Sequence, residues 1–202
     1  MAIETSKNLG GVGAILMFIG FIPWVPYGWI LALVGLILSL IGFKGLADHF
    51  REAGVFNNAL YATIVAVIGV VVAVGLLMVA AVGLLTELGI DFANIAEWSA
   101  TASQITDMTV LNVLLDFVVW VVLAGVVVWV CLIIGAVLLR KSLGVVSEKS
   151  GVGLFGTTGL IMLIGAAIPI IGLLLLWIGL LLLAVAFFSL RPQQEMSAAT
   201  PT

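Results

Sequence analysis

The stretch FIPWVPYG, residues 21–28, interrupts a long apolar run with two prolines and a glycine. Pro23 and Pro26 cannot donate a helical backbone N–H, and each proline restricts the residue before it. The flanking run Gly10–Phe43 is too long for one helix crossing a bilayer core of about 30 Å. The stretch therefore predicts a tight turn between two membrane helices, and a single kinked helix is the alternative interpretation.

The composition places most of the chain in lipid. Apolar residues make up 64% of the 202 residues, charged residues only 8%, and the mean hydropathy is +1.39. In a soluble domain about a quarter of the residues are charged. Lipid leaves no water for backbone groups, so the spanning segments must be helices or a closed barrel. Uninterrupted runs such as Ala62–Leu85 and Val118–Leu139 favour helices, because barrel strands alternate apolar and polar residues.

The sequence therefore predicts an all-α, polytopic transmembrane helical bundle of six helices. The expected helices are Gly10–Ile22, Tyr27–Phe43, Ala59–Leu85, Val110–Leu139, Val152–Ile168 and Ile170–Leu190. They form a single membrane domain over residues 1–191, followed by a polar tail at 192–202. No cleavable signal peptide is apparent, so the first helix is expected to be retained.

The basic residues set the orientation. All seven lie in alternate connections or at the ends: Lys7, Lys44, Arg51, Arg140, Lys141, Lys149 and Arg191. The connection Thr86–Thr109 carries four carboxylates and no basic residue. The positive-inside rule then predicts a cell-membrane protein with both termini in the cytoplasm. Trp24, Tyr27, Trp29 and Trp98 suit an aromatic belt at the outer surface.

The first hairpin resembles the last one. Aligning Gly13–Val25 with Gly159–Ile171, and Gly28–Leu46 with Gly172–Leu190, needs one gap of two residues at Pro26–Tyr27. This pairs Pro23 with Pro169 and predicts a repeat of residues 10–46 and 156–190, around a central helix pair at 56–141. Two intervening helices would make the repeat parallel, as in some transporters. The alternative is that any short membrane hairpin needs a Pro/Gly turn and small packing residues.

Small residues mark the helix-packing faces. They recur at spacings of three and four in the second helix: Gly28, Ala32, Gly35, Ser39 and Gly42. The sixth helix keeps Gly172 and Gly179 at the same seven-residue interval as Gly28 and Gly35. Lipid gives helices little hydrophobic drive to associate, so close approach along small residues stabilises membrane bundles. These positions are therefore predicted to pack against neighbouring helices rather than to line a ligand groove.

Few polar residues are candidates for chemistry. Asp116 is the one carboxylate within an apolar run, and counting about 20 helical residues back from Leu139 places it at the outer interface. The functional alternative is a carboxylate in an outer vestibule, with Asn112 one helical turn away.

A second polar region, residues 43–62, predicts a helical extension along the membrane surface. Leu46, Phe50 and Ala53 are expected to face lipid. Asn57 and Asn58 are interpreted as groups that cap the start of the third helix, with a ligand site as the alternative. A short amphipathic helix is expected near Ala96–Ile105.

Most enzyme chemistries find no matching motif. The chain has one histidine, His49, and one cysteine, Cys131, which is interpreted as a packing residue. No Gly-rich phosphate loop, metal-spaced His/Cys cluster or Ser/His/Asp constellation is present in the sequence. We therefore expect no catalytic residue, no cofactor, no metal and no nucleic-acid partner.

The segments GFIPWVPYGWILALVGLILSLIGFKGLADHF (residues 20–50), FNNALYA (56–62) and FFSL (187–190) resemble the DUF996 family. This family comprises small multi-pass membrane proteins of archaea and bacteria, and the resemblance runs from Gly10 to Leu190. It implies a multi-pass helical fold. It implies no activity for any residue, because the family is one of unknown function.

Two hypotheses for the function follow. The first is a non-enzymatic structural or accessory subunit of a membrane assembly, whose partners are the lipid bilayer and other membrane subunits or further copies of the chain. The alternative is a small transporter or channel built on the repeated hairpins. A water-filled cavity lined by Asp116, Asn112 and Thr109, or by Asn57, Asn58 and Tyr61, would favour the alternative.

Overall fold

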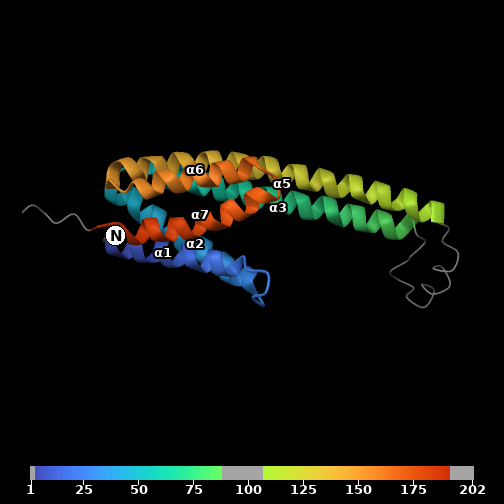
Figure 1. Ribbon diagram of the computed structural model, residues 1–202, viewed down its shortest axis with the longest axis horizontal. Helices are drawn as coiled ribbons and strands as arrows, with labels where there is room; N and C mark the ends of the chain where they lie inside the picture. The colour runs from blue at the N-terminus through green and yellow to red at the C-terminus, as the bar shows by residue number, and fades with distance from the viewer. Residues whose placement is uncertain (1–2, 88–106, 192–202) are drawn as a thin grey trace, which may run out of the picture. The chain divides into compact units, whose positions relative to one another are not determined.

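The computed structural model describes residues 3–87 and 107–191, and in these ranges all regular structure is α-helical (Figure 1). The described helices are α1 (Ile3–Gly20), α2 (Gly28–Phe50), α3 (Ala53–Glu87), α5 (Asp107–Ser150), α6 (Gly153–Ala167) and α7 (Ile171–Phe188). The predictions of an all-helical chain and of these six helices are confirmed. The amphipathic helix expected near Ala96–Ile105, Trp98 and the tail at 192–202 lie outside the described residues.

Four of the described helices are long and apolar enough to cross a membrane: α2, α3, the Leu111–Ser150 part of α5, and α7. Helix α6 has 15 residues and measures about 22 Å at 1.5 Å per residue, which is short for a bilayer core of about 30 Å. The crossing of the membrane by all six helices stays a prediction.

Helices α1 and α2 extend beyond the predicted spans. Helix α1 begins at Ile3 rather than Gly10, because its polar first turns are bound to the rest of the molecule. Ser6 is fully buried, and Lys7 Nζ donates a 2.9 Å hydrogen bond to the carbonyl oxygen of Leu190. Helix α2 continues past Phe43 to Phe50, as the predicted helical extension requires.

The prediction of a connection at residues 140–151 is wrong, because α5 continues through this segment to Ser150. The reason is burial: Leu143 and Val146 are 0% exposed and belong to the hydrophobic core. Ser142 is also 0% exposed, and its Oγ donates a 2.6 Å hydrogen bond to the carbonyl oxygen of Val55 in the first turn of α3. The charged residues of this segment resemble those of a connection, but the segment is an amphipathic helix.

The chain divides into two compact units. Unit 1 comprises Met1–Thr63 and Ile133–Thr202, and unit 2 comprises Ile64–Leu132. Helices α3 and α5 each contribute to both units, with 35 and 44 residues. At 1.5 Å per residue these helices measure about 52 and 66 Å, so both exceed a bilayer core of about 30 Å.

The hydrophobic core of unit 1 contains three phenylalanines in edge-to-face contact. The ring of Phe187 lies 5.3 Å from the ring of Phe43 and 5.4 Å from the ring of Phe155. Leu46 is 0% exposed in the same core, so the prediction that it faces lipid is wrong. The charged residues that follow Phe43 in the sequence are consistent with a surface helix, but α2 turns Leu46 inward, toward α3, α5 and α7.

Unit 2 contains the remaining parts of α3 and α5. A Cβ built on Gly69 would lie 2.6 Å from the Cβ of Cys131, so the two helices approach closely at this point. The buried residues in the described part of unit 2 are small or β-branched: Gly69, Ala73, Ala80, Val113 and Ala124. Many of its large apolar side chains are exposed, and Val71, Met78 and Val119 are more than 60% exposed. Small residues inside and large apolar ones outside are typical of helices in lipid.

Candidate functional site

The α1–α2 hairpin is held by backbone contact at glycines. A Cβ on Gly28 would lie 2.5 Å from the carbonyl oxygen of Gly20, and a Cβ on Gly35 would lie 2.5 Å from that of Gly13. A Cβ on Gly42 would lie 2.6 Å from the Cα of Gly10. The structure thus brings the predicted packing positions of α2 against α1. The same face includes Ala32, whose backbone nitrogen approaches Gly20, and the buried Ser39, whose Oγ approaches Gly13.

The α6–α7 hairpin uses a similar contact near its turn. A Cβ on Gly165 would lie 2.8 Å from the carbonyl oxygen of Gly172, and Gly172 packs in return on the backbone of Gly165. Farther along α7, a Cβ on Gly179 would lie 2.7 Å from the Cγ of Met162. Here a side chain rather than a backbone fills the space.

The two hairpins differ in register from the sequence alignment. Gly13 packs on α2, whereas its aligned partner Gly159 lies against Arg140 and Leu143 of α5. Moving the first-helix alignment by one residue matches Met17 and Gly20 with Met162 and Gly165. The contacts agree with the moved register, because Gly35 approaches the Met17 backbone and Gly179 approaches Met162.

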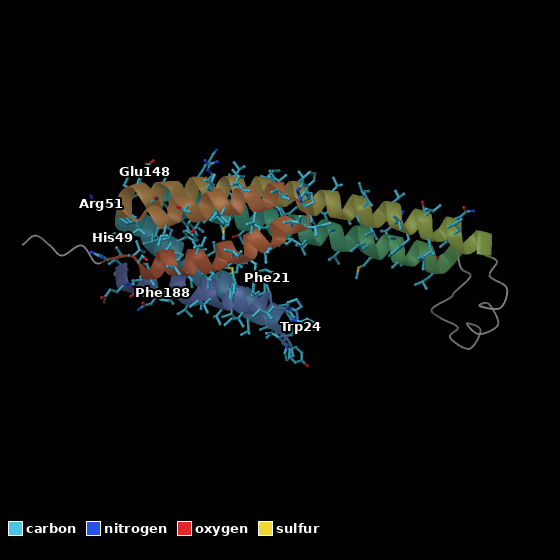
Figure 2. The ribbon with its side chains drawn as sticks, viewed as in Figure 1. Phe21, Trp24, His49, Arg51, Glu148 and Phe188 are labelled. Carbon is cyan, nitrogen blue, oxygen red and sulfur yellow. The ribbon has the colours of Figure 1, made fainter. Side chains whose placement is uncertain are left out.

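The predicted turn prolines lie in the two hairpin turns. Pro23 and Pro26 occupy the second positions of consecutive turns, in which Val25 N–H donates to the carbonyl oxygen of Ile22 (3.1 Å) and Gly28 N–H donates to that of Val25 (3.1 Å). Tyr27 has a φ of 59°, the positive value that a type II turn requires at its third position. Trp24 is 89% exposed, and Figure 2 shows it projecting from this turn.

The second turn is tighter and wholly apolar. Pro169 precedes Ile170, which has a φ of 65° and a ψ of −68°. The N–H of Ile171 donates to the carbonyl oxygen of Pro169 at 2.8 Å, which closes a three-residue γ-turn around Ile170. Such a backbone is strained for a β-branched residue.

The candidate polar residues of α5 lie on its surface. Asp116 and Asn112 are exposed, on the part of α5 that belongs to unit 2. Neither residue lines the cavity described below.

The two neighbouring asparagines of α3, Asn57 and Asn58, have different surroundings. Helix α3 begins at Ala53, so Asn57 and Asn58 lie inside the helix, and their prediction as caps is wrong. Asn57 lines a surface cavity of about 380 Å³ in unit 1, whereas Asn58 does not. The other residues around this cavity are Lys44, Ala47, Asp48, Arg51, Ala53 and Phe56.

Sequence reasoning missed this cavity. The sequence predicts a helix along the membrane surface at residues 43–62, with no second wall opposite its charged residues. The signal was their spacing, because Lys44, Asp48 and Arg51 follow one another at intervals of four and three and therefore share one face of the helix. The structure adds the opposite wall, formed by Phe56 and Asn57 from the beginning of α3.

No metal site is evident in residues 3–87 and 107–191, since no three His, Cys, Asp or Glu side chains of these ranges come together. Cys131 carries a free thiol and packs against Gly69.

Comparison with known proteins adds a family. The family model described as "Protein of unknown function (DUF996)" matches residues 31–187. The chain belongs to the DUF996 family. It is also 29% identical over 195 residues to the uncharacterized protein MJ1644 of Methanocaldococcus jannaschii, covering 94% of each chain. No solved structure matches.

The DUF996 match covers the cavity and almost all of the second hairpin but only part of the first hairpin. It begins inside α2 and ends near the end of α7, so it includes the cavity, the α6–α7 hairpin and both helices of unit 2. Helix α1 and the first three residues of α2 precede the match, so the contact of Gly20 with Gly28 lies outside it, whereas Gly35 and Gly42 lie inside it. The archaeal relative aligns over 94% of its own length, so this similarity is not confined to the part matched by the DUF996 model.

Proposed function

We propose that this DUF996 protein is a non-enzymatic subunit, structural or accessory, of an assembly in the cell membrane. Its apolar helices indicate a membrane protein. The proposal concerns what these helices do there. Support comes from the surface of unit 2, where large apolar side chains are exposed on both helices, including Val71, Met78 and Val119.

The observation that carries the proposal is a pair of exposed glycines. Gly75 and Gly83 lie on α3 two helical turns apart, and a Cβ on either would meet no atom within 4 Å. These glycines therefore do not serve the contact with α5. Glycine is unfavourable in a helix interior by about 1 kcal/mol relative to alanine. Its use in membrane helices is to let a second helix approach the backbone, so we assign this face of α3 to a helix of another membrane protein.

The proposed orientation has both termini in the cytoplasm. All seven basic residues belong to unit 1, and the segment that forms unit 2 contains only acidic charges. The positive-inside rule favours the cytoplasmic side for the basic segments. We further propose that the two hairpins arose by duplication, supported by the equivalent contacts of Gly20 with Gly28 and of Gly165 with Gly172.

The test is isolation of the native protein in a gentle detergent, followed by mass spectrometry and size analysis of the complex. A stoichiometric second polypeptide is expected. The double variant Gly75→Ile, Gly83→Ile should lose that partner because the larger side chains fill the proposed face. The matched control is Gly125→Ile on α5. A Cβ there also meets no atom within 4 Å, but no second glycine lies two turns away to form a face with it, so this variant should keep the partner.

Two results would contradict the proposal. One is a chain that migrates alone or only with its own copies, which would move the next experiment to flux assays in reconstituted vesicles. The other is a partner retained equally by the double variant and by the wild type, which would remove the α3 face from the interface.

A further inference from the structure

The cavity of unit 1 lies at the corner where α2 ends and α3 begins. One wall consists of Lys44, Ala47, Asp48 and Arg51, and the other of Ala53, Phe56 and Asn57. Figure 2 shows Arg51 and His49 at the end of α2. Both walls include apolar side chains, since Ala47 is only 5% exposed and Phe56 packs against the hydrophobic core. The rim of the cavity is polar, and the cavity opens at the surface of unit 1, where a ligand can enter.

The charges around the cavity favour an anion. Lys44 and Arg51 supply two cations, and Asp48 supplies one carboxylate. None of the three forms an ion pair within 4.0 Å with another residue in the described parts of the chain. The neighbouring Glu52 is already neutralised by Lys149, with 3.0 Å between Oε1 and Nζ. The residues that line the cavity therefore carry a net positive charge, and no ion pair within the described residues 3–87 and 107–191 compensates it.

The two cations are held in place in different ways. The Nζ of Lys44 lies 5.6 Å from the centroid of the Phe56 ring, a cation–π distance that keeps the ammonium over the cavity wall. Arg51 has a φ of 55° at the end of α2, a position where helices favour glycine because glycine adopts this conformation without strain. Arg51 therefore lies beside the cavity with a backbone conformation that is strained for an arginine.

We propose that this cavity binds a phosphate group on an anionic headgroup, that is, a phosphate ester carried by a membrane lipid or by a small soluble molecule. Arg51 supplies paired N–H donors that match phosphate oxygens, and Lys44 supplies a second positive charge. The side-chain amide of Asn57 supplies a neutral donor from the opposite wall. Asp48 opposes the phosphate and limits the affinity. The site is independent of the partner face proposed for α3.

The experiment measures binding to the full-length protein in detergent by native mass spectrometry. Three probes separate the sources: a short-chain phosphatidylglycerol, the diacylglycerol with the same chains and no phosphate, and glycerol 1-phosphate. The wild type should bind phosphatidylglycerol at least about tenfold more tightly than the diacylglycerol, since charge-assisted hydrogen bonds are made only to the phosphate. Glycerol 1-phosphate binding as tightly as the lipid would support the site and identify a soluble ester as its ligand.

The variants separate binding from stability. Lys44→Ala and Arg51→Gly should each weaken phosphatidylglycerol binding by about tenfold, although Arg51→Gly should raise the melting temperature by relieving the positive φ. Asp48→Asn should tighten binding. Lys141→Ala, which removes an exposed lysine of α5 outside the cavity, is the matched control and should change nothing. The proposal is overturned if the two cavity variants bind like the control, or if no probe with a phosphate binds better than the diacylglycerol.

Discussion

The indole of Trp177 lies flat on the ring of Phe18, with 4.3 Å between ring centroids and 11° between ring planes. The Nε1 of Trp177 also donates a 2.9 Å hydrogen bond to the backbone carbonyl oxygen of Phe18. Phe18 lies in the last turn of α1, where carbonyl groups have no helical partner. Trp177 therefore binds α7 to the end of α1 by both packing and a hydrogen bond.

Trp177→Phe should keep the stacking and remove the hydrogen bond. The carbonyl group of Phe18 is then left without its partner, at a cost of about 1–2 kcal/mol in the free energy of unfolding. Reversible unfolding in detergent, followed by circular dichroism, measures the change. Trp29→Phe is the control, because Trp29 is 65% exposed, and it should leave stability unchanged. Equal stability of the two variants would show that the indole N–H contributes nothing.

Gly35→Ala should destabilise the α1–α2 hairpin. The new methyl group would lie 2.5 Å from the carbonyl oxygen of Gly13 and 2.7 Å from the backbone nitrogen of Met17, and these backbone atoms cannot rotate away. The helices must separate, at a cost on the order of 1–3 kcal/mol. Gly125→Ala has open space around the new methyl group and should stabilise the protein by about 0.5–1 kcal/mol. Thermal unfolding of both variants decides whether close approach is the reason for Gly35.

Two buried serines should respond in opposite ways to alanine. Ser142 Oγ donates to the carbonyl oxygen of Val55, so Ser142→Ala should cost about 1 kcal/mol. Ser39 is 2% exposed, and in the described structure its Oγ has no hydrogen-bond partner. Ser39→Ala should therefore be neutral or stabilising. Denaturant unfolding of the two variants compares them directly, and a larger loss for Ser39→Ala would reveal a partner for that hydroxyl.

The helical architecture was predictable from sequence because apolar runs and prolines act locally. Pro23 and Pro169 end helices through their own backbone chemistry. The small residues of α2 recur at spacings of three and four, so the sequence alone shows that they share one face. The ends of the helices were less predictable, since Leu143 and Val146 extend α5 through burial against distant segments. Leu46 was misplaced for the same reason.

The cavity was harder to predict than the helices. It depends on the sharp turn at Arg51, where the N–H groups of both Arg51 and Glu52 donate to the carbonyl oxygen of Ala47. That turn brings Asn57 and Phe56 opposite Lys44. Nothing in the local sequence favours a positive φ at an arginine. Asp116 was a candidate because a carboxylate is rare in an apolar run, and Asn112 because it lies one helical turn away. A rare charge does not by itself predict a cavity, and neither residue lines this one.

Ile170→Gly should stabilise the second hairpin turn. Ile170 combines a φ of 65° with a branched side chain that is 84% exposed, so glycine relieves strain on the order of 1–3 kcal/mol and loses little packing. Ile171→Gly is the matched comparison, because Ile171 is the first residue of α7 and is 71% exposed. This second variant should cost about 0.5–1 kcal/mol. Melting temperatures that fall equally in both variants would contradict the strained turn.

The proposed orientation predicts which ends of α3 and α5 are accessible from outside the cell. In a Cys131→Ala background, Glu87→Cys at the end of α3 should react with a membrane-impermeant maleimide in intact cells, because the acidic connection is assigned to the outside. Glu148→Cys, near the end of α5, should react only after the membrane is opened. Both positions are exposed, so burial does not explain a difference. Labelling of Glu148→Cys alone in intact cells would reverse the topology and move the phosphate-binding cavity to the outer surface.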